Sequence, residues 1–232
     1  MSGFYTEADY ESTIIELFEN MGWRHVYGPD LDRDYRDPLY EEVLDDAIRR
    51  INPDMPESAI REAIFKLKNF DNADIVHKNG VLMDYIQHGV EVRYLVGSEE
   101  RAGLVYLVDY KNPDNNSFVI ANQWTFIENS NKRPDVLLFL PVVLMEFKSP
   151  SREETDASEA YAQIRNYMHE IPSMFIYNCI CVMSDHLTSK AGTITSGEDR
   201  FMEWKTRDGS YENTQYAQFD TFFEDVPEGA PA

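Results

Sequence analysis

Three ionisable side chains, Asp135, Glu146 and Lys148, lie at the ends of two apolar runs that are separated by Pro141. Glu146 and Lys148 are two residues apart, so on a strand they would project from the same face. If the chain turns back at Pro141 as a hairpin, Asp135 at the start of the first strand comes beside Glu146 at the end of the second. The sequence therefore predicts that two carboxylates and one ammonium group meet at the rim of a buried sheet.

Such a group of side chains suits the hydrolysis of phosphodiester bonds with Mg²⁺. This cation is usually held by one or two carboxylates together with water and phosphate oxygens. Asp135 and Glu146 would supply the carboxylates, the Phe147 carbonyl could add an oxygen, and Lys148 could orient water and stabilise developing negative charge. The alternative is that these residues are ordinary solvated strand ends, because Glu-x-Lys tripeptides are common. The apolar surroundings favour the metal site, since charged groups seldom end buried strands without a partner.

The composition limits the classes of function. A formal net charge of −21 argues against a chain that grips nucleic acid by itself, because DNA binding depends largely on Lys and Arg displacing counterions from phosphates. The five histidines and two cysteines lack the spacing of a zinc site, and Cys179 and Cys181 are read as free thiols. Free thiols fit a reducing cytosol, so we expect a cytoplasmic protein. No apolar run approaches the roughly 20 residues that span a bilayer, so no membrane partner is predicted.

The elements that position these side chains follow from hydrophobic periodicity. Thr6 and Asp9 are arranged as a capping pair ahead of a helix that Gly22 ends. Nearly continuous apolar runs at 135–139 and 142–147 are typical of central strands covered on both faces. The patterns predict further helices over 38–50, 56–67, 74–87 and 155–170, and further strands over 91–96, 104–108, 117–127 and 174–182.

The order of several motifs resembles one known family. Arg133-Pro-Asp-Val-Leu-Leu-Phe139, followed by Val142-Val-Leu-Met-Glu-Phe-Lys-Ser-Pro150, is similar to the PD-(D/E)xK nuclease signature of type I restriction enzyme R subunits. Ala160-Tyr-Ala-Gln-Ile-Arg-Asn-Tyr167 resembles the QxxxY motif of that family. Shorter similarities are found at Thr6-Glu7, Glu11, Met21-Gly-Trp23, Asn122-Gln123, Gly192-Thr193 and Arg200-Phe-x-x-Trp204.

The resemblance implies a role for particular residues. Asp135 and Glu146 would be the metal-binding acids and Lys148 the catalytic lysine. Gln163 and Tyr167, which share a helix face, would contact the DNA backbone or brace the site. An acid on the first helix would complete the metal environment: Glu11 matches best, and Glu7 and Glu16 compete with it.

The resemblance also implies an architecture and a setting. We expect an α/β fold of the restriction-endonuclease-like type, a central mixed sheet flanked by helices, with a helical N-terminal region. The nuclease domain would span 1–207, with 38–88 a candidate helical insertion, and 208–232 would be an acidic tail or a linker toward a motor domain. Mg²⁺ is the expected cofactor. Because no Gly-x-x-x-x-Gly-Lys-Ser/Thr segment is present, ATP would act only through that motor, and this chain should not hydrolyse it.

The expected partners are DNA and the modification (methyltransferase) and specificity subunits of a restriction complex. Two other functions stay open at this point. The chain could be a docking module that keeps a nuclease-like fold without catalysis, or another PD-(D/E)xK nuclease of DNA repair or restriction. Neither the DNA sequence that is recognised nor the oligomeric state follows from these residues.

Overall fold

The computed structural model describes residues 6–71, 73–139, 142–148, 157–184 and 189–203. Its centre is a seven-stranded mixed sheet in the order β1-β4-β7-β8-β9-β10-β11, in which β1 pairs with β4 and β8 with β9 in parallel and the other pairs are antiparallel. The strands are β1 Arg24–Tyr27, β4 Val119–Asn122, β7 Val136–Phe139, β8 Val142–Phe147, β9 Asn178–Ser184, β10 Ser189–Gly192 and β11 Met202–Glu203. The expected mixed sheet is therefore confirmed.

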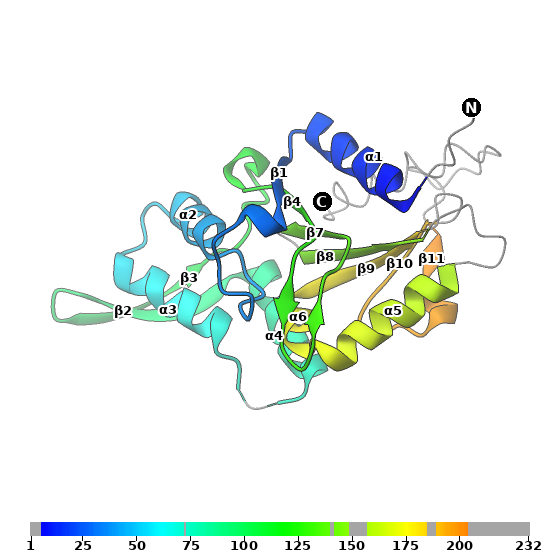
Figure 1. The fold of residues 1–232 in the computed structure, drawn as a ribbon. Coiled ribbons are helices and arrows are strands. Elements are labelled where there is room, and N and C mark those ends of the chain that lie inside the picture. The colour runs from blue at the N-terminus through cyan, green and yellow to red at the C-terminus, as the bar shows by residue number, and fades with distance from the viewer. Residues whose placement is uncertain (1–5, 72, 140–141, 149–156, 185–188, 204–232) are drawn as a thin grey trace.

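Helices cover both faces of this sheet (Figure 1). Helix α1 (Glu7–Asn20) lies on one face, and α5 (Ala157–Glu170) and α6 (Pro172–Ile176) lie on the other. Along β8, Val143, Met145 and Phe147 belong to the core under α1, whereas Leu144 belongs to the core under α5. The strand period of two thus determines which helix each residue meets.

Local chemistry fixes the first helix. The Thr6 hydroxyl accepts a hydrogen bond from the Asp9 backbone N–H, and the Asp9 carboxylate accepts from the Thr6 N–H, which completes the predicted capping box. Gly22 takes φ +90°, so it ends the helix in a backbone region that other residues avoid. Tyr10, Ile14 and Phe18 then share one buried face.

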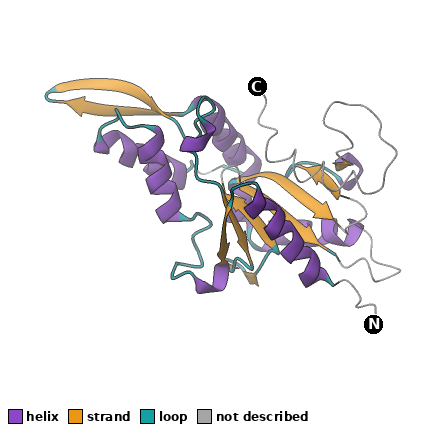
Figure 2. Ribbon diagram, turned by 90° about the horizontal axis from the view of Figure 1, so that it is seen from above, coloured by secondary structure: helices purple, strands orange, loops and turns teal. Residues whose placement is uncertain are grey.

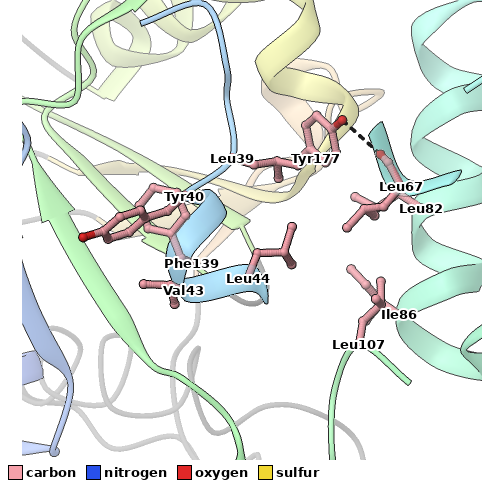
Figure 3. Close-up of a pocket in the computed structure, with 10 residues that line it drawn as sticks. All are labelled: Leu39, Tyr40, Val43, Leu44, Leu67, Leu82, Ile86, Leu107, Phe139 and Tyr177. Atoms are coloured by element: carbon pink, nitrogen blue, oxygen red, sulfur yellow. Dashed lines mark hydrogen bonds between the residues drawn. The ribbon is translucent and has the colours of Figure 1, made fainter. Parts of the chain in front are cut away.

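A separate helical region carries a hairpin that projects from the molecule (Figures 1 and 2). It contains α2 (Glu41–Ile51), α3 (Glu57–Lys68), α4 (Ile75–His88) and the two-stranded sheet of β2 (Val90–Val96) and β3 (Glu99–Val105). Figure 3 shows how this region meets the central sheet, around an apolar pocket lined mainly by aliphatic side chains. Tyr177, the residue after α6, donates a hydrogen bond from its hydroxyl to the Leu67 carbonyl of α3 at 3.1 Å.

Three predicted strands were wrong in extent. The run 117–127 forms two strands, β4 and β5 (Phe126–Ile127), because Gln123 adopts φ +53° and breaks the ladder; β5 pairs with β6 (Asn131–Lys132). The run 174–182 begins as helix α6, with Pro172 in its first turn, and only then becomes β9. The strand placed at 104–108 ends at Val105, because the β2–β3 turn at Gly97 and Ser98 brings residues 99–105 opposite 90–96.

Some predictions fall outside the described residues: the turn at Pro141, the first residues of the helix predicted from Thr155, and the tail at 208–232 with its boundary at 207. The helices expected at 38–50, 56–67 and 74–87 correspond to α2, α3 and α4. That this range is an insertion stays a prediction. No helix among the described residues is long and apolar enough to cross a membrane.

Candidate metal centre

The β7–β8 hairpin brings Asp135 and Glu146 together. Val136 pairs with Met145, so the next residues toward the strand ends, Asp135 and Glu146, lie opposite each other on the α5 side of the sheet. The Phe147 backbone N–H donates to Asp135 Oδ2 at 2.8 Å, which ties the first carboxylate directly to the strand that carries the second. Asp135 and Glu146 therefore lie together at the strand ends, as the sequence predicted.

Lys148 joins the same cluster. Its Nζ donates to Glu146 Oε1 and to the Phe147 carbonyl, each at 2.9 Å. Glu146 is 1% exposed and Lys148 13% exposed, so this ion pair is largely removed from water. The second carboxylate oxygen, Glu146 Oε2, is buried and has no hydrogen-bond partner among the described residues. An unpaired buried carboxylate oxygen is costly, so this atom is available to a cation or a donor.

Burial disfavours the charged forms of both acids. Burial first, and the Asp135 charge second, raise the pKa of Glu146 to about 8. Burial also raises the pKa of Asp135 to about 6, although the Phe147 N–H and Lys148 oppose the shift. A divalent cation would reverse this preference, because it stabilises both carboxylates in the ionised form.

The donor set fits Mg²⁺. Asp135, Glu146 and the Phe147 carbonyl offer only oxygen atoms, and one of these atoms, Glu146 Oε2, is buried and unpaired. Within the described residues, no three His, Cys, Asp or Glu side chains are grouped tightly enough to hold a metal by themselves. Two carboxylates completed by water are the usual arrangement for Mg²⁺, in contrast to a closed zinc site. Cys179 and Cys181 are free, as expected.

The first helix presents two acids toward this cluster. Glu7 and Glu11 are one turn apart and partly buried, and the negative charges of both help to raise the pKa of Asp135, Glu7 more than Glu11; Glu7 also helps to raise the pKa of Glu146. Glu11 accepts hydrogen bonds from Asn122 Nδ2 at 2.6 Å and from Gln123 Nε2 at 2.9 Å. Glu16, the third competitor, is exposed.

Helix α5 forms one wall of a cleft beside the cluster. Gln163 Nε2 donates to the Tyr167 hydroxyl at 2.8 Å, and Tyr167 is 5% exposed. Burial, and then the charge of Glu146, raise the pKa of Tyr167. The cleft is lined by Lys132, Lys148, Glu159, Ala162, Gln163, Asn166 and Tyr167.

Two supporting residues were missed by the sequence analysis. Lys132 lies across the cleft from α5 and pairs with Glu170 at 2.6 Å. Tyr10 lies under the end of β8: its ring packs on Phe147 at 4.9 Å between centroids, and its hydroxyl is 2.7 Å from Ser184 Oγ. In the sequence, Tyr10 is marked only as part of the apolar face of the first helix. Lys132 is marked only by its position three residues before Asp135.

Most of the chain is similar to known proteins. The family described as "Type I restriction enzyme R protein N terminus" matches residues 4–200. The HindI endonuclease subunit of Haemophilus influenzae, a type I restriction enzyme, is 32% identical over 215 residues, which is 87% of this chain and 20% of that protein. The putative type I restriction enzyme MjaIXP endonuclease subunit of Methanocaldococcus jannaschii is 30% identical over 208 residues, 84% of this chain and 20% of that protein. The chain thus spans about one fifth of the length of these relatives. A match over most of the sequence, from the capped first helix to the segment beyond β10, shows that the chain belongs to the family of type I restriction enzyme R protein N-terminal regions.

Proposed function

We propose that this chain is the Mg²⁺-dependent endonuclease domain of a type I restriction R protein and hydrolyses DNA phosphodiester bonds within a larger ATP-driven complex. The observation that carries the proposal is the buried pairing of Asp135 with Glu146, whose Oε2 atom has no partner among the described residues. Two acids with raised pKa values and a lysine, at the edge of a cleft, form a combination that a merely structural strand end does not need.

Asp135 and Glu146 would hold the cation, and Glu7 or Glu11 would add negative charge from the first helix. Bound Mg²⁺ would supply Lewis-acid stabilisation of the phosphate and a lower pKa for water. Lys148 directs two of its three N–H donors to Glu146 and Phe147, which leaves one for a substrate oxygen. Lys148 therefore holds a fixed positive charge where negative charge develops on the reacting phosphate.

The cleft between Lys132 and α5 would receive the DNA backbone. Gln163 and Asn166 offer neutral amide donors there, and Lys132 and Lys148 also line the cleft, although Lys132 is paired with Glu170, Lys148 with Glu146, and Glu159 adds a negative charge. In a chain of net charge −21, most of the grip on DNA would then come from other parts of the complex. The motor and the modification and specificity subunits would hold the DNA, so the isolated chain should bind duplex weakly and cut it poorly.

The test uses the R protein that contains this domain, assembled with its modification and specificity subunits. Lys148→Ala should reduce DNA cleavage by about 100-fold or more, because it removes a charge at the reacting phosphate, while ATP hydrolysis by the motor continues unchanged. Lys111→Ala, which changes an exposed loop lysine, is the matched control and should cleave normally. Equal cleavage by the wild type and Lys148→Ala would reject the nuclease assignment and favour a docking module.

A further inference from the structure

Gln123 has an unusual backbone conformation. It follows β4 with φ +53°, and it is the only described non-glycine residue with positive φ. Such a conformation is disfavoured for a residue with a Cβ atom and persists where the surrounding structure requires it. The Gln123 backbone also passes close to Gly28, the residue after β1, because a Cβ atom built at Gly28 would lie 2.7 Å from the Gln123 carbonyl oxygen.

The positive φ changes where two neighbouring side chains can reach. Successive residues of a regular strand point to opposite faces, so Asn122 and Gln123 would normally point apart. Here both side-chain amides donate to the same carboxylate, Asn122 Nδ2 to Glu11 Oε1 at 2.6 Å and Gln123 Nε2 to Glu11 Oε2 at 2.9 Å. Each oxygen of Glu11 therefore has its own donor, from residues more than 100 positions away in the sequence.

The same residue also contacts the metal-site strand. The Gln123 backbone N–H donates to the Asp135 carbonyl at 3.1 Å. Asn122 is supported from the other side, since its Oδ1 is 2.9 Å from His25 Nε2 on β1. Asn122 and Gln123 thus connect α1, β1 and Asp135, the residue just before β7.

We infer that Asn122 and Gln123 form an amide clamp that fixes the Glu11 carboxylate at the end of β4, where the Gln123 backbone is bonded to Asp135, as a further negative charge near the cation site, with Gln123 as a positioning residue. This inference rests on the proposed function and deepens it, because the two amide hydrogen bonds hold Glu11 in one position and so distinguish it from Glu7. Glu7 shares the helix face but has no such clamp among the described contacts.

Gln123→Gly is the informative variant. Glycine adopts φ +53° without strain and keeps the backbone N–H that binds Asp135, so only the side-chain donor to Glu11 is lost. The clamp predicts that this variant unfolds at the same or a higher denaturant concentration than the wild type, yet binds Mn²⁺ about 10-fold more weakly. Mn²⁺ alone, titrated into the protein and followed by the electron paramagnetic resonance of the free ion, is the probe.

A double-mutant cycle with Glu11→Gln tests whether Gln123 acts through Glu11. If it does, the double variant binds Mn²⁺ no more weakly than Glu11→Gln alone. Glu16→Gln, an exposed acid on the same helix, is the control and should bind as the wild type does. Wild-type affinity in Gln123→Gly, or losses in the two single variants that multiply in the double, would overturn the clamp. Mn²⁺ binding that is unchanged in Asp135→Asn would instead reject the metal site itself, and the clamp with it.

Discussion

Replacing Glu146 with glutamine should remove a large part of the pH dependence of stability in the metal-free protein. Burial and the Asp135 charge raise the pKa of Glu146 from 4.5 to about 8 in the folded chain. The folded state therefore binds this proton more tightly than the unfolded state. The stability that this group contributes is complete below the unfolded pKa and is lost as the pH rises through the folded pKa.

The magnitude follows from the two pKa values. Integrated between pH 6 and pH 9, a shift from 4.5 to about 8 lowers the free energy of unfolding by about 3 kcal/mol. Glu146→Gln has no group to ionise, so its free energy of unfolding should stay nearly level over this range. Asp135 remains in both proteins, and with a pKa of about 6 it loses most of its contribution before the range begins.

The assay is urea unfolding in EDTA at pH 6, 7, 8 and 9, followed by the fluorescence of the buried Trp23 and Trp124. Glu16→Gln changes an exposed acid on α1 and should follow the wild-type profile. Added Mg²⁺ should flatten the wild-type profile, because a bound cation favours the ionised carboxylate. Parallel profiles for the wild type and Glu146→Gln in EDTA would refute the claim that Glu146 is an acid destabilised by burial.

Three further changes have expected outcomes. Gly28→Ala should lower the free energy of unfolding by about 1–3 kcal/mol in urea titrations, because its Cβ would clash with the Gln123 carbonyl; an unchanged midpoint would contradict that close approach. Arg33→Ala should destabilise by about 2–4 kcal/mol in the same titrations, since Arg33 stacks at 3.5 Å on the Trp124 ring and donates to backbone carbonyls; a loss below about 0.5 kcal/mol would show that the contact is dispensable. Tyr167→Phe keeps the buried ring and should leave the thermal midpoint within a few degrees while cleavage by the assembled complex falls about 10-fold; full activity would exclude a role for the hydroxyl.

The hairpin and its chemistry were accessible from the sequence because they depend on local rules. A strand repeats every two residues, so the spacing of Glu146 and Lys148 fixes a common face wherever the strand lies. The capping box of Thr6 and Asp9 is equally local, and so is the glycine that ends α1. Asp135 required one longer step, a hairpin between two adjacent apolar runs, and the register confirms that step.

Tertiary structure alone decided the remaining features. The run 117–127 has continuous strand character, and nothing local to Gln123 announces a positive φ; the conformation is held by Glu11 on α1, the close approach of Gly28 and the bond to Asp135. Which of Glu7, Glu11 and Glu16 comes near Asp135 likewise depends on which turn of α1 lies over the end of β4. Sequence periodicity specifies the face of an element, whereas its position along and across the neighbouring elements comes from packing and from hydrogen bonds between distant residues.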